Sequence, residues 1–192
     1  MINKPAVILV DVQNNFFTEP LRAQRIQSVI EPLQKLIATA RKNAVPLIYC
    51  VDAHYPQDVE VTQKWGAHAI KDTKDAEVIS ELSPDQKMDY IVEKRTYSGF
   101  YETGLDPLLQ SLYEGKGAKT LVLCGVHTHI CIRHTAADAF FRGYHIIVAE
   151  DGVEAFSEEA HQQGLEYMEY LYKAKIRATN EIIREIASNT AV

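Results

Sequence analysis

The sequence predicts an α/β protein, a three-layer sandwich in which a mostly parallel six-stranded sheet carries helices on both faces. Short, nearly continuous apolar runs recur along the chain, as expected of strands that are covered on both sides. Segments with a helical spacing of apolar residues separate these runs. The 192 residues suffice for one full hydrophobic core, and no repeat, linker or low-complexity tract divides them. We therefore expect a single domain over 1–192.

The predicted strands coincide with the apolar runs. They are 6–10 (AVILV), 46–51 (PLIYCV), 90–92 (YIV), 120–126 (TLVLCGV), 145–149 (HIIVA) and a weaker sixth at 174–178 (AKIRA). Strands that alternate with helices pair in parallel, because each helix returns the chain to the same end of the sheet.

Helices are predicted in the intervals between the strands. Apolar residues from Ile26 to Ala40 follow the i, i+3, i+4, i+7 spacing, and Pro32 interrupts them, so this helix begins near Pro32 or is kinked there. The other predicted helices are 105–112, 131–142, 157–173 and 180–188, the last with Asn180 as its N-cap. The connection 55–89 is long and polar, as connections that carry functional residues usually are.

Composition limits the partners. Hydrophobic residues make up 46% of the chain and charged residues 24%, as in ordinary globular proteins. A net charge of -6, with no block of Lys or Arg, argues against nucleic-acid binding. The N-terminal apolar run holds only about six residues before Asp11, too few for a signal peptide or a membrane span. We expect a cytoplasmic protein with no membrane partner.

Polar residues follow several of the predicted strands. Asp11 follows the first, Asp52 and His54 the second, Lys94 the third, and the stretch 127–131 the fourth. In parallel sheets the active site lies at the carboxyl ends of the strands. These residues, distant in sequence, are therefore expected to converge on one edge of the sheet.

Cys131 is the candidate nucleophile. An odd count of three cysteines without CxxC spacing indicates neither a disulfide framework nor a zinc finger, and Cys50 and Cys124 lie in apolar runs as small core residues would. Cys131 stands near the first turn of a helix, where the helix dipole lowers the pKa of a thiol. The alternative is a third buried cysteine without reactivity.

Asp11 and Lys94 can assist such a thiol. A carboxylate at the end of a buried strand can accept the thiol proton and later deliver it to a leaving amine. The lysine can hold the negatively charged pair together. The alternative is an ordinary salt bridge at the rim of the sheet.

A metal site is predicted beside this group. Asp52 and His54 are two residues apart on an extended segment and point the same way, and carboxylate with imidazole suits zinc, iron or manganese. His68 can complete the set, although a DxH pair alone is more often surface chemistry.

The other histidines favour plainer interpretations. His127 and His129 with Cys131 lack the usual zinc spacing. His134 is expected to pack or cap within its helix. His145 begins a strand and His161 lies in a polar helix, and neither has an obvious partner.

Three ordered motifs resemble the isochorismatase-like cysteine hydrolases, in the branch of the nicotinamidases and N-carbamoylsarcosine amidases. They are VDVQNNF, VEKRTYSGFYETGLD and LCGVHTHICIRHTAADAFFRGY, and the resemblance runs from about residue 5 to 155. It implies the isochorismatase-like hydrolase fold and a catalytic set of Asp11, Lys94 and Cys131.

The stretch VDAH…KWGAH is similar to the metal-binding segment of nicotinamidases. This similarity implies that Asp52, His54 and His68 hold one divalent ion, zinc first, with manganese or iron possible. Isochorismatases proper generally lack these ligands, so the resemblance favours an amidase. It also implies that the metal keeps one coordination position open, to which a pyridine nitrogen of the substrate binds.

The resemblance implies further features of the site. Phe16 and Trp65 stand where aromatic groups sandwich the substrate ring, and Tyr97 is assigned to the same pocket. A cis peptide bond is expected at Val126–His127, where it would aim the backbone N–H groups of His127 and Cys131 at the oxyanion.

Two positions depart from the family pattern. Asn15 and His129 stand where the family commonly has aspartate. The change at His129 bears on the substrate pocket, so an N-carbamoyl or ureido amide is the alternative to nicotinamide.

The expected function is a metal-assisted cysteine amidohydrolase that releases ammonia from a small amide, nicotinamide first, through a thioester on Cys131. The alternatives are N-carbamoylsarcosine or another ureido substrate, and a catalytically silent binding module of the same fold. Relatives usually associate, so a homo-oligomer, dimer or tetramer, is expected, with the aromatic stretch 167–172 (YMEYLY) as candidate surface.

Overall fold

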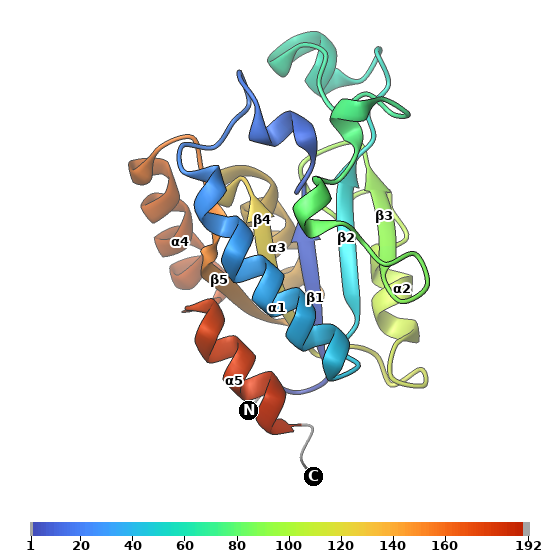
Figure 1. Cartoon of the computed structure of the whole chain (residues 1–192), viewed down its shortest axis with the longest axis vertical. Helices are drawn as coiled ribbons and strands as arrows, with labels where there is room; N and C mark the ends of the chain where they lie inside the picture. The colour runs from blue at the N-terminus through green and yellow to red at the C-terminus, as the bar shows by residue number, and fades with distance from the viewer. Residues whose placement is uncertain (1, 190–192) are drawn as a thin grey trace.

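The computed structural model of the chain describes residues 2–189 and shows three layers (Figure 1). The strands are β1 (Pro5–Val10), β2 (Leu47–Asp52), β3 (Tyr90–Lys94), β4 (Thr120–Val126), β5 (His145–Glu154) and β6 (Lys175–Arg177). They form one sheet in the order β3-β2-β1-β4-β5-β6, and every pairing is parallel. The predicted fold class is confirmed.

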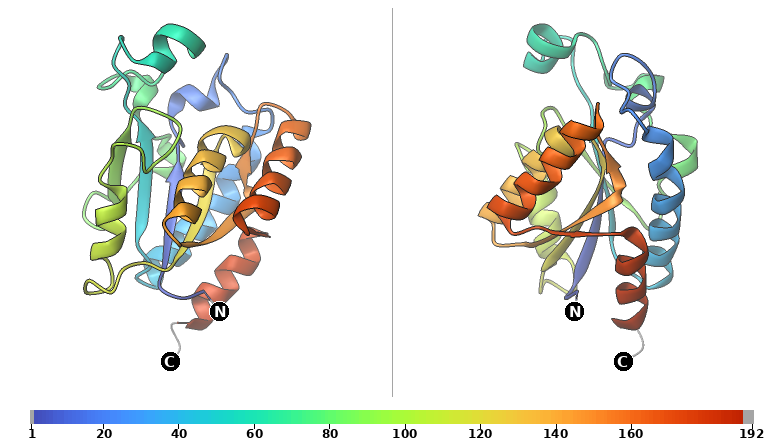
Figure 2. Two further views of the ribbon diagram at one scale, coloured as in Figure 1. Left: turned by 180° about the vertical axis from the view of Figure 1, so that it is seen from behind. Right: turned by 90° about the vertical axis from the view of Figure 1, so that its left-hand side faces the viewer.

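Helices cover both faces of the sheet (Figure 2). They are α1 (Ile30–Lys42), α2 (Leu105–Ser111), α3 (Arg133–Phe141), α4 (Glu158–Tyr172) and α5 (Thr179–Asn189). Shorter turns are η1 (Asn14–Phe17), η2 (Ile26–Val29), η3 (Val61–Trp65), η4 (Lys74–Ala76), η5 (Ser80–Leu82) and η6 (Thr128–Ile132), of which η3 and η6 have π-helical hydrogen bonding.

Two apolar cores follow from the alternation of side chains along the strands. In β1, Val7 and Leu9 face α1 and α5, whereas Ile8 and Val10 face α2, α3 and α4. The central strands β1, β2 and β4 are buried almost throughout, and the edge strands β3 and β6 are partly exposed. This explains the nearly continuous apolar runs of the sequence.

The helix boundaries agree with the pattern at most positions. The helix predicted around Pro32 does begin near it, since the 3-10 turn η2 precedes α1 and places Pro32 in the first turn. The prediction that Asn180 caps the last helix is wrong, because α5 already begins at Thr179. The N–H and hydroxyl of Thr179 both donate to the Asp151 side chain, which replaces a local cap.

The sheet topology places the site. The chain moves outward from β1 to β3 on one side and from β4 to β6 on the other, so β1 and β4 flank the switch point at which α/β proteins bind ligands. The segment between β2 and β3 contains only short turns; its first part, with η3, lies over the carboxyl ends of the strands, and its later part, with η5, packs beside α1 on the way to the start of β3 (Figure 1).

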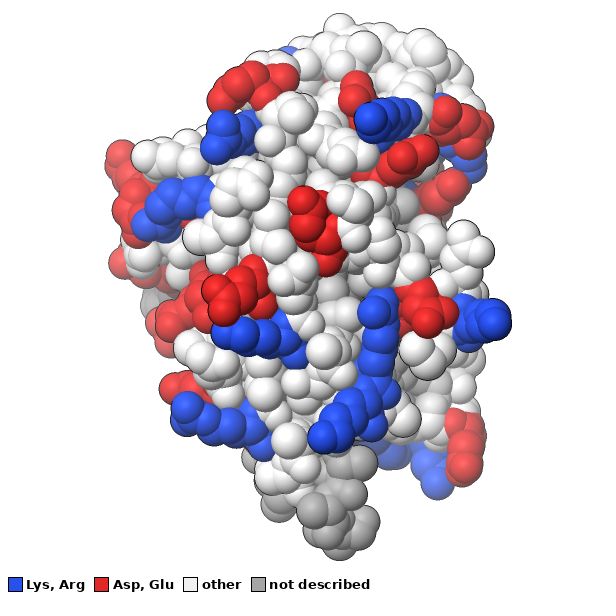
Figure 3. Space-filling model, viewed as in Figure 1, with Lys and Arg blue, Asp and Glu red and all other residues white. Residues whose placement is uncertain are grey.

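Charged side chains of both signs are interspersed on one face of the molecule. On the face shown in Figure 3, basic side chains alternate with acidic ones and neither sign gathers into an extended patch. Among the described residues, no helix has both the length and the apolar character that crossing a membrane requires.

Candidate active site

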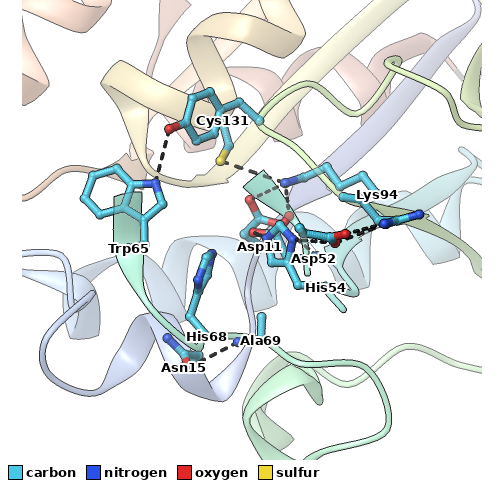
Figure 4. Close-up of polar contacts among 12 residues, drawn as sticks. Asp11, Asn15, Asp52, His54, Trp65, His68, Ala69, Lys94 and Cys131 are labelled. Carbon is cyan, nitrogen blue, oxygen red and sulfur yellow. Dashed lines mark hydrogen bonds and ion pairs between the residues drawn. The ribbon is translucent and has the colours of Figure 1, made fainter. Parts of the chain in front are cut away.

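Asp11, Lys94 and Cys131 meet at the carboxyl ends of three strands (Figure 4). Asp11 directly follows β1, Lys94 is the last residue of β3, and Cys131 lies in η6, which follows β4. The Lys94 Nζ atom is 2.9 Å from Asp11 Oδ2 and 3.8 Å from the Sγ atom of Cys131. All three side chains are buried. The structure therefore brings the three predicted catalytic residues into mutual contact.

Burial dominates the acid–base properties of this group. It raises the pKa of Asp11 to about 7, with Asp52 adding to the rise and Lys94 opposing it. It also raises the pKa of the Cys131 thiol well above its usual value, again against the effect of Lys94. The prediction of a thiol pKa lowered by a helix dipole is thus wrong, because Cys131 lies inside the π-helical turn and is buried. The favoured resting state is therefore a protonated Cys131 thiol beside the Asp11 carboxylate.

Lys94 is held between two carboxylates. Its Nζ atom is 2.5 Å from Asp52 Oδ1 as well as 2.9 Å from Asp11. Burial disfavours its charge, but the two carboxylates outweigh burial and raise the pKa of Lys94. The ammonium therefore keeps its charge and orients both acids.

Asp52, His54 and His68 form the only such cluster of possible metal ligands found among the described residues. One ligand atom from each lies within 4.8 Å of the others, and all three residues are buried. Burial opposes the charge of Asp52, but Lys94 and the contact with His54 hold the pKa of Asp52 at about 2. A cluster of His127, His129 and Cys131, which the sequence spacing disfavours, is not found among these residues.

The orientation of both imidazoles fits a metal ion. The Nδ1 atom of His68 is 2.8 Å from the Gly66 carbonyl, and that of His54 is 3.3 Å from Asp58 Oδ2. Each Nδ1 thus carries the hydrogen, which leaves the Nε2 lone pair for a metal. The Nε2 atom of His54 is buried and has no hydrogen-bond partner. This unpaired buried nitrogen, facing a carboxylate, is what a divalent ion would satisfy.

Asp58 contacts His54 at its Nδ1 atom, and no periodic pattern in the sequence marks this residue. It accepts hydrogen bonds from the backbone N–H of Tyr55 at 2.9 Å and from Arg95 Nε at 3.0 Å. A second Arg95 nitrogen pairs with the other carboxylate oxygen. This two-point contact fixes the carboxylate against His54.

Two amide side chains position the loops that carry the ligands. The Gln13 side chain donates to the Asp52 carbonyl at 2.7 Å and accepts from the Asp52 N–H at 2.8 Å. Asn15, one of the two departures from the family pattern, accepts a hydrogen bond from the N–H of Ala69 at 3.3 Å (Figure 4). A neutral amide therefore supports the loop that carries His68.

An aromatic cavity adjoins Cys131, and Phe16, Trp65 and Tyr97, the three residues predicted for a substrate pocket, all line it. Its volume is about 20 Å³, room for about one water, and the Trp65 Nε1–H donates across it to the Tyr97 hydroxyl at 3.1 Å (Figure 4). The cavity is therefore nearly filled by its own side chains. The rest of the lining, beyond the nucleophile and the metal cluster, is Leu21, Glu60, His127, Ile130 and Phe156.

The turn after β4 has a fixed geometry. The Val126–His127 peptide bond is cis. Gly125 before it has φ +108°, and a Cβ atom there would lie 2.0 Å from the Val10 carbonyl oxygen, so only glycine fits. The His127 ring donates to the Leu21 carbonyl at 2.8 Å and stacks on Phe156 with ring centres 4.2 Å apart.

Helix α4 supports this turn from outside. The buried His161 side chain is 3.0 Å from the Thr128 hydroxyl, a partner that was not obvious from the sequence. One turn further along, the Cβ position of Gly164 lies 3.2 Å from His129 Cα, which lets α4 approach closely.

The remaining predicted residues lie outside the reacting group. His129 does not line the cavity but packs edge-on against the lining residues Phe156 and His127, so its departure from the family pattern reaches the cavity only through those rings. His134 contacts the Ile130 carbonyl at 2.7 Å as a packing residue. Cys50 and Cys124 are free and buried in the cores.

Comparisons with known proteins show which proteins this chain resembles. A family model described as the Isochorismatase domain matches residues 5–181. Nicotinamidase 3 of Arabidopsis thaliana is 29% identical over 168 residues, which cover 83% of this chain and 78% of that protein.

Solved structures show the same fold. The crystal structure of N-carbamoylsarcosine amidase from Thermoplasma acidophilum aligns with a TM-score of 0.83 at 39% identity, covering 92% of this chain and 97% of that one. A pyrazinamidase of Pyrococcus horikoshii in complex with zinc aligns with a TM-score of 0.81 at 25% identity, covering 92% and 99%.

Proposed function

The chain belongs to the isochorismatase family, and from this premise we propose that it is a metal-assisted cysteine amidohydrolase that converts nicotinamide to nicotinate and ammonia. One observation carries the proposal: the Lys94 ammonium contacts Asp11, Asp52 and Cys131 directly beside a buried set of metal-type ligands. One domain, 1–192, holds the whole reaction.

The first half-reaction transfers the acyl group to Cys131. As the Sγ atom attacks the amide carbon, the thiol proton moves to Asp11, and the carbonyl electron pair moves onto oxygen. The backbone N–H groups of His127 and Cys131 receive this oxyanion. When the C–N bond breaks, Asp11 returns the proton to nitrogen, and ammonia leaves behind a thioester.

The second half-reaction regenerates the thiol. Asp11 takes a proton from water as the water oxygen attacks the thioester carbon, and the C–S bond breaks with the proton passing to sulfur. The balance is one amide and one water converted to one carboxylic acid and one ammonia. A carboxyl whose pKa is raised to about 7 suits this alternation between base and acid near neutral pH.

Asp52, His54 and His68 are the residues that would hold the metal, with zinc proposed first because of its preference for this ligand set. When bound, the ion supplies a Lewis-acid position for a ring nitrogen of the substrate. Phe16 and Trp65 then flank the ring, and Tyr97 closes the cavity against Trp65.

A second candidate is hydrolysis of N-carbamoylsarcosine or another ureido compound. The 39% identity to N-carbamoylsarcosine amidase from Thermoplasma acidophilum favours it. The same nucleophile, acid–base group and lysine serve both reactions, because each breaks a C–N bond of an amide carbonyl.

Ammonia release from a substrate panel tests the proposal. Zinc-loaded protein is given nicotinamide, benzamide and N-carbamoylsarcosine, with the Cys131→Ala variant as the blank. Nicotinamide is expected to be hydrolysed at least about tenfold faster than benzamide, which has the same shape without a ring nitrogen. If only the ureido compound is hydrolysed, the proposed substrate is wrong and the proposed mechanism stands. If no amide is hydrolysed, the chain is a catalytically silent binding module.

A further inference from the structure

Glu60 is a buried carboxylate in the wall of the cavity that the mechanism does not use. Glu60 is only 8% exposed, and its Oε1 atom is buried without a hydrogen-bond partner. It lines the cavity at Cys131, and it also lines an outer hollow of about 920 Å³ that meets the cavity at Glu60 and Tyr97. A ligand that reaches Cys131 from this hollow therefore passes Glu60.

No free cation balances Glu60 in the described part of the chain. Neither lysine nor arginine lines the inner cavity. The nearest ammonium, Lys94, is already paired with Asp11 and Asp52. Even a divalent ion at the metal cluster would bring the sum of Asp11, Asp52, Glu60 and Lys94 only to neutrality.

The outer hollow has no excess of positive charge either. Four acidic and three basic residues line it. Of the basic residues, Arg95 is paired with Asp58 and Lys94 is paired as described above. Lys64 lies over the ring of Trp65. A substrate carboxylate would find one lysine there without a carboxylate partner, Lys64, and further in only Lys94, which two carboxylates already hold.

We propose that Glu60 makes this site select amides without a negative charge and exclude those that bear a carboxylate. A substrate carboxylate would lose its hydration in the cavity and face a buried like charge. A neutral amide meets aromatic walls instead, and an N–H donor on it would satisfy Glu60 Oε1. The proposal rests on the proposed function, in which Cys131 reacts in this cavity. It predicts that ureido acids, which bear a carboxylate, are excluded.

Alkylation of Cys131 tests the selection without any substrate. Iodoacetamide and iodoacetate react with a thiol at the same carbon and differ only in amide against carboxylate. Their rates with Cys131 in the zinc-loaded protein are followed by mass spectrometry and divided by their rates with glutathione. The resulting preference for iodoacetamide is expected to exceed about tenfold in the wild type, because like-charge contacts oppose the acid.

Three variants identify the source of the preference. Glu60→Gln is expected to reduce it by about tenfold, and Glu60→Asp, which keeps the charge, is expected to retain it. Glu102→Gln, at an exposed acid of the outer hollow, is the matched control and should leave it unchanged.

Two results would overturn the proposal. One is a wild-type preference equal to that of glutathione, or a preference for iodoacetate, which would point to a metal position that attracts carboxylates. The other is a Glu60→Gln variant that loses zinc and keeps the wild-type preference, because Glu60 would then serve the metal. Ammonia release is measured separately, so a protein that hydrolyses no amide yet prefers iodoacetamide fails only the proposed function.

Discussion

The Lys94 ammonium lies 3.8 Å from the Cys131 sulfur and is the one cation of the described site that touches the nucleophile. It opposes the effect of burial, which raises the pKa of the thiol. The same ammonium holds Asp11 and Asp52. Lys94 thus connects the nucleophile, the general base and the metal cluster.

Replacing Lys94 by methionine is expected to slow alkylation of Cys131 by iodoacetamide by at least about tenfold at pH 8 and to abolish amide hydrolysis. The reason is that the pKa of the thiol rises further without the cation, and each pKa unit lowers the thiolate fraction about tenfold. Circular dichroism checks that the variant folds. Lys71→Met, which removes the surface pair with Glu93, is the control and should change neither rate.

A second prediction concerns the support of His54. Asp58→Asn is expected to weaken zinc binding by about 10- to 100-fold, because an amide orients the imidazole less well than a carboxylate does. Competition with a chelator at fixed pH measures the affinity. Asp89→Asn removes a comparable buried carboxylate paired with Arg41, away from the site, and should leave zinc affinity unchanged. Equal affinities for wild type and Asp58→Asn would contradict the prediction.

A third prediction concerns Gly125. Gly125→Ala is expected to lower the free energy of unfolding by at least about 3 kcal/mol, because its Cβ would overlap the Val10 carbonyl and its φ is +108°. Urea unfolding measures the change. Gly104→Ala is the control, since Gly104 has φ -84° and open space at its Cβ position. A loss of similar size in both variants would refute the assignment.

The strands and the convergent site were predictable because both depend on short-range patterns. Continuous apolar runs mark β1, β2 and β4, and in a parallel sheet their ends must meet. Asp11, Lys94 and Cys131 could therefore be grouped from their places after the strands.

Features that depend on distant partners were not predictable. Asp151 caps α5 from 28 residues away, so no local pattern excluded Asn180. His161 finds Thr128 at a separation of 33 residues. Glu60 lies in a connection without periodicity, and only the folded loop shows that it lines the cavity at Cys131. The raised pKa of Cys131 likewise follows from burial, which the sequence position near a helix did not disclose.

A fourth prediction concerns association. The predicted stretch lies on α4, where Tyr170 is 76% exposed, and it adjoins Phe141 of α3, which is 72% exposed, through Tyr172. We expect a dimer or tetramer that buries these rings. Light scattering at micromolar concentration measures the mass, and Phe141→Asp with Tyr170→Asp should yield a monomer. Met88→Asp, at an exposed residue outside this group, should not. A monomeric wild type would count against the interface.

The last prediction concerns the pH dependence of stability through His127. Burial lowers the pKa of His127 to about 3, against an ordinary value of 6.5. Above pH 6.5 the ring is neutral in both the folded and the unfolded chain. As the pH falls from 6.5 toward 3, His127 binds a proton in the unfolded chain but not in the folded chain. The free energy of unfolding then approaches a loss of about 1.4 kcal/mol per pH unit.

His127→Asn removes this loss. The variant is less stable at pH 7, because it loses the contact with Phe156, but its deficit relative to wild type should shrink by about 2.3 kcal/mol between pH 6.5 and 4.5. Urea unfolding of both proteins at matched pH values, with a chelator present throughout, measures the difference. His145→Asn, at an exposed histidine, should run parallel to wild type over the same range. A deficit of His127→Asn that stays constant with pH would show that the proton affinity of this ring does not change on folding, and that His127 is exposed to water in the native turn.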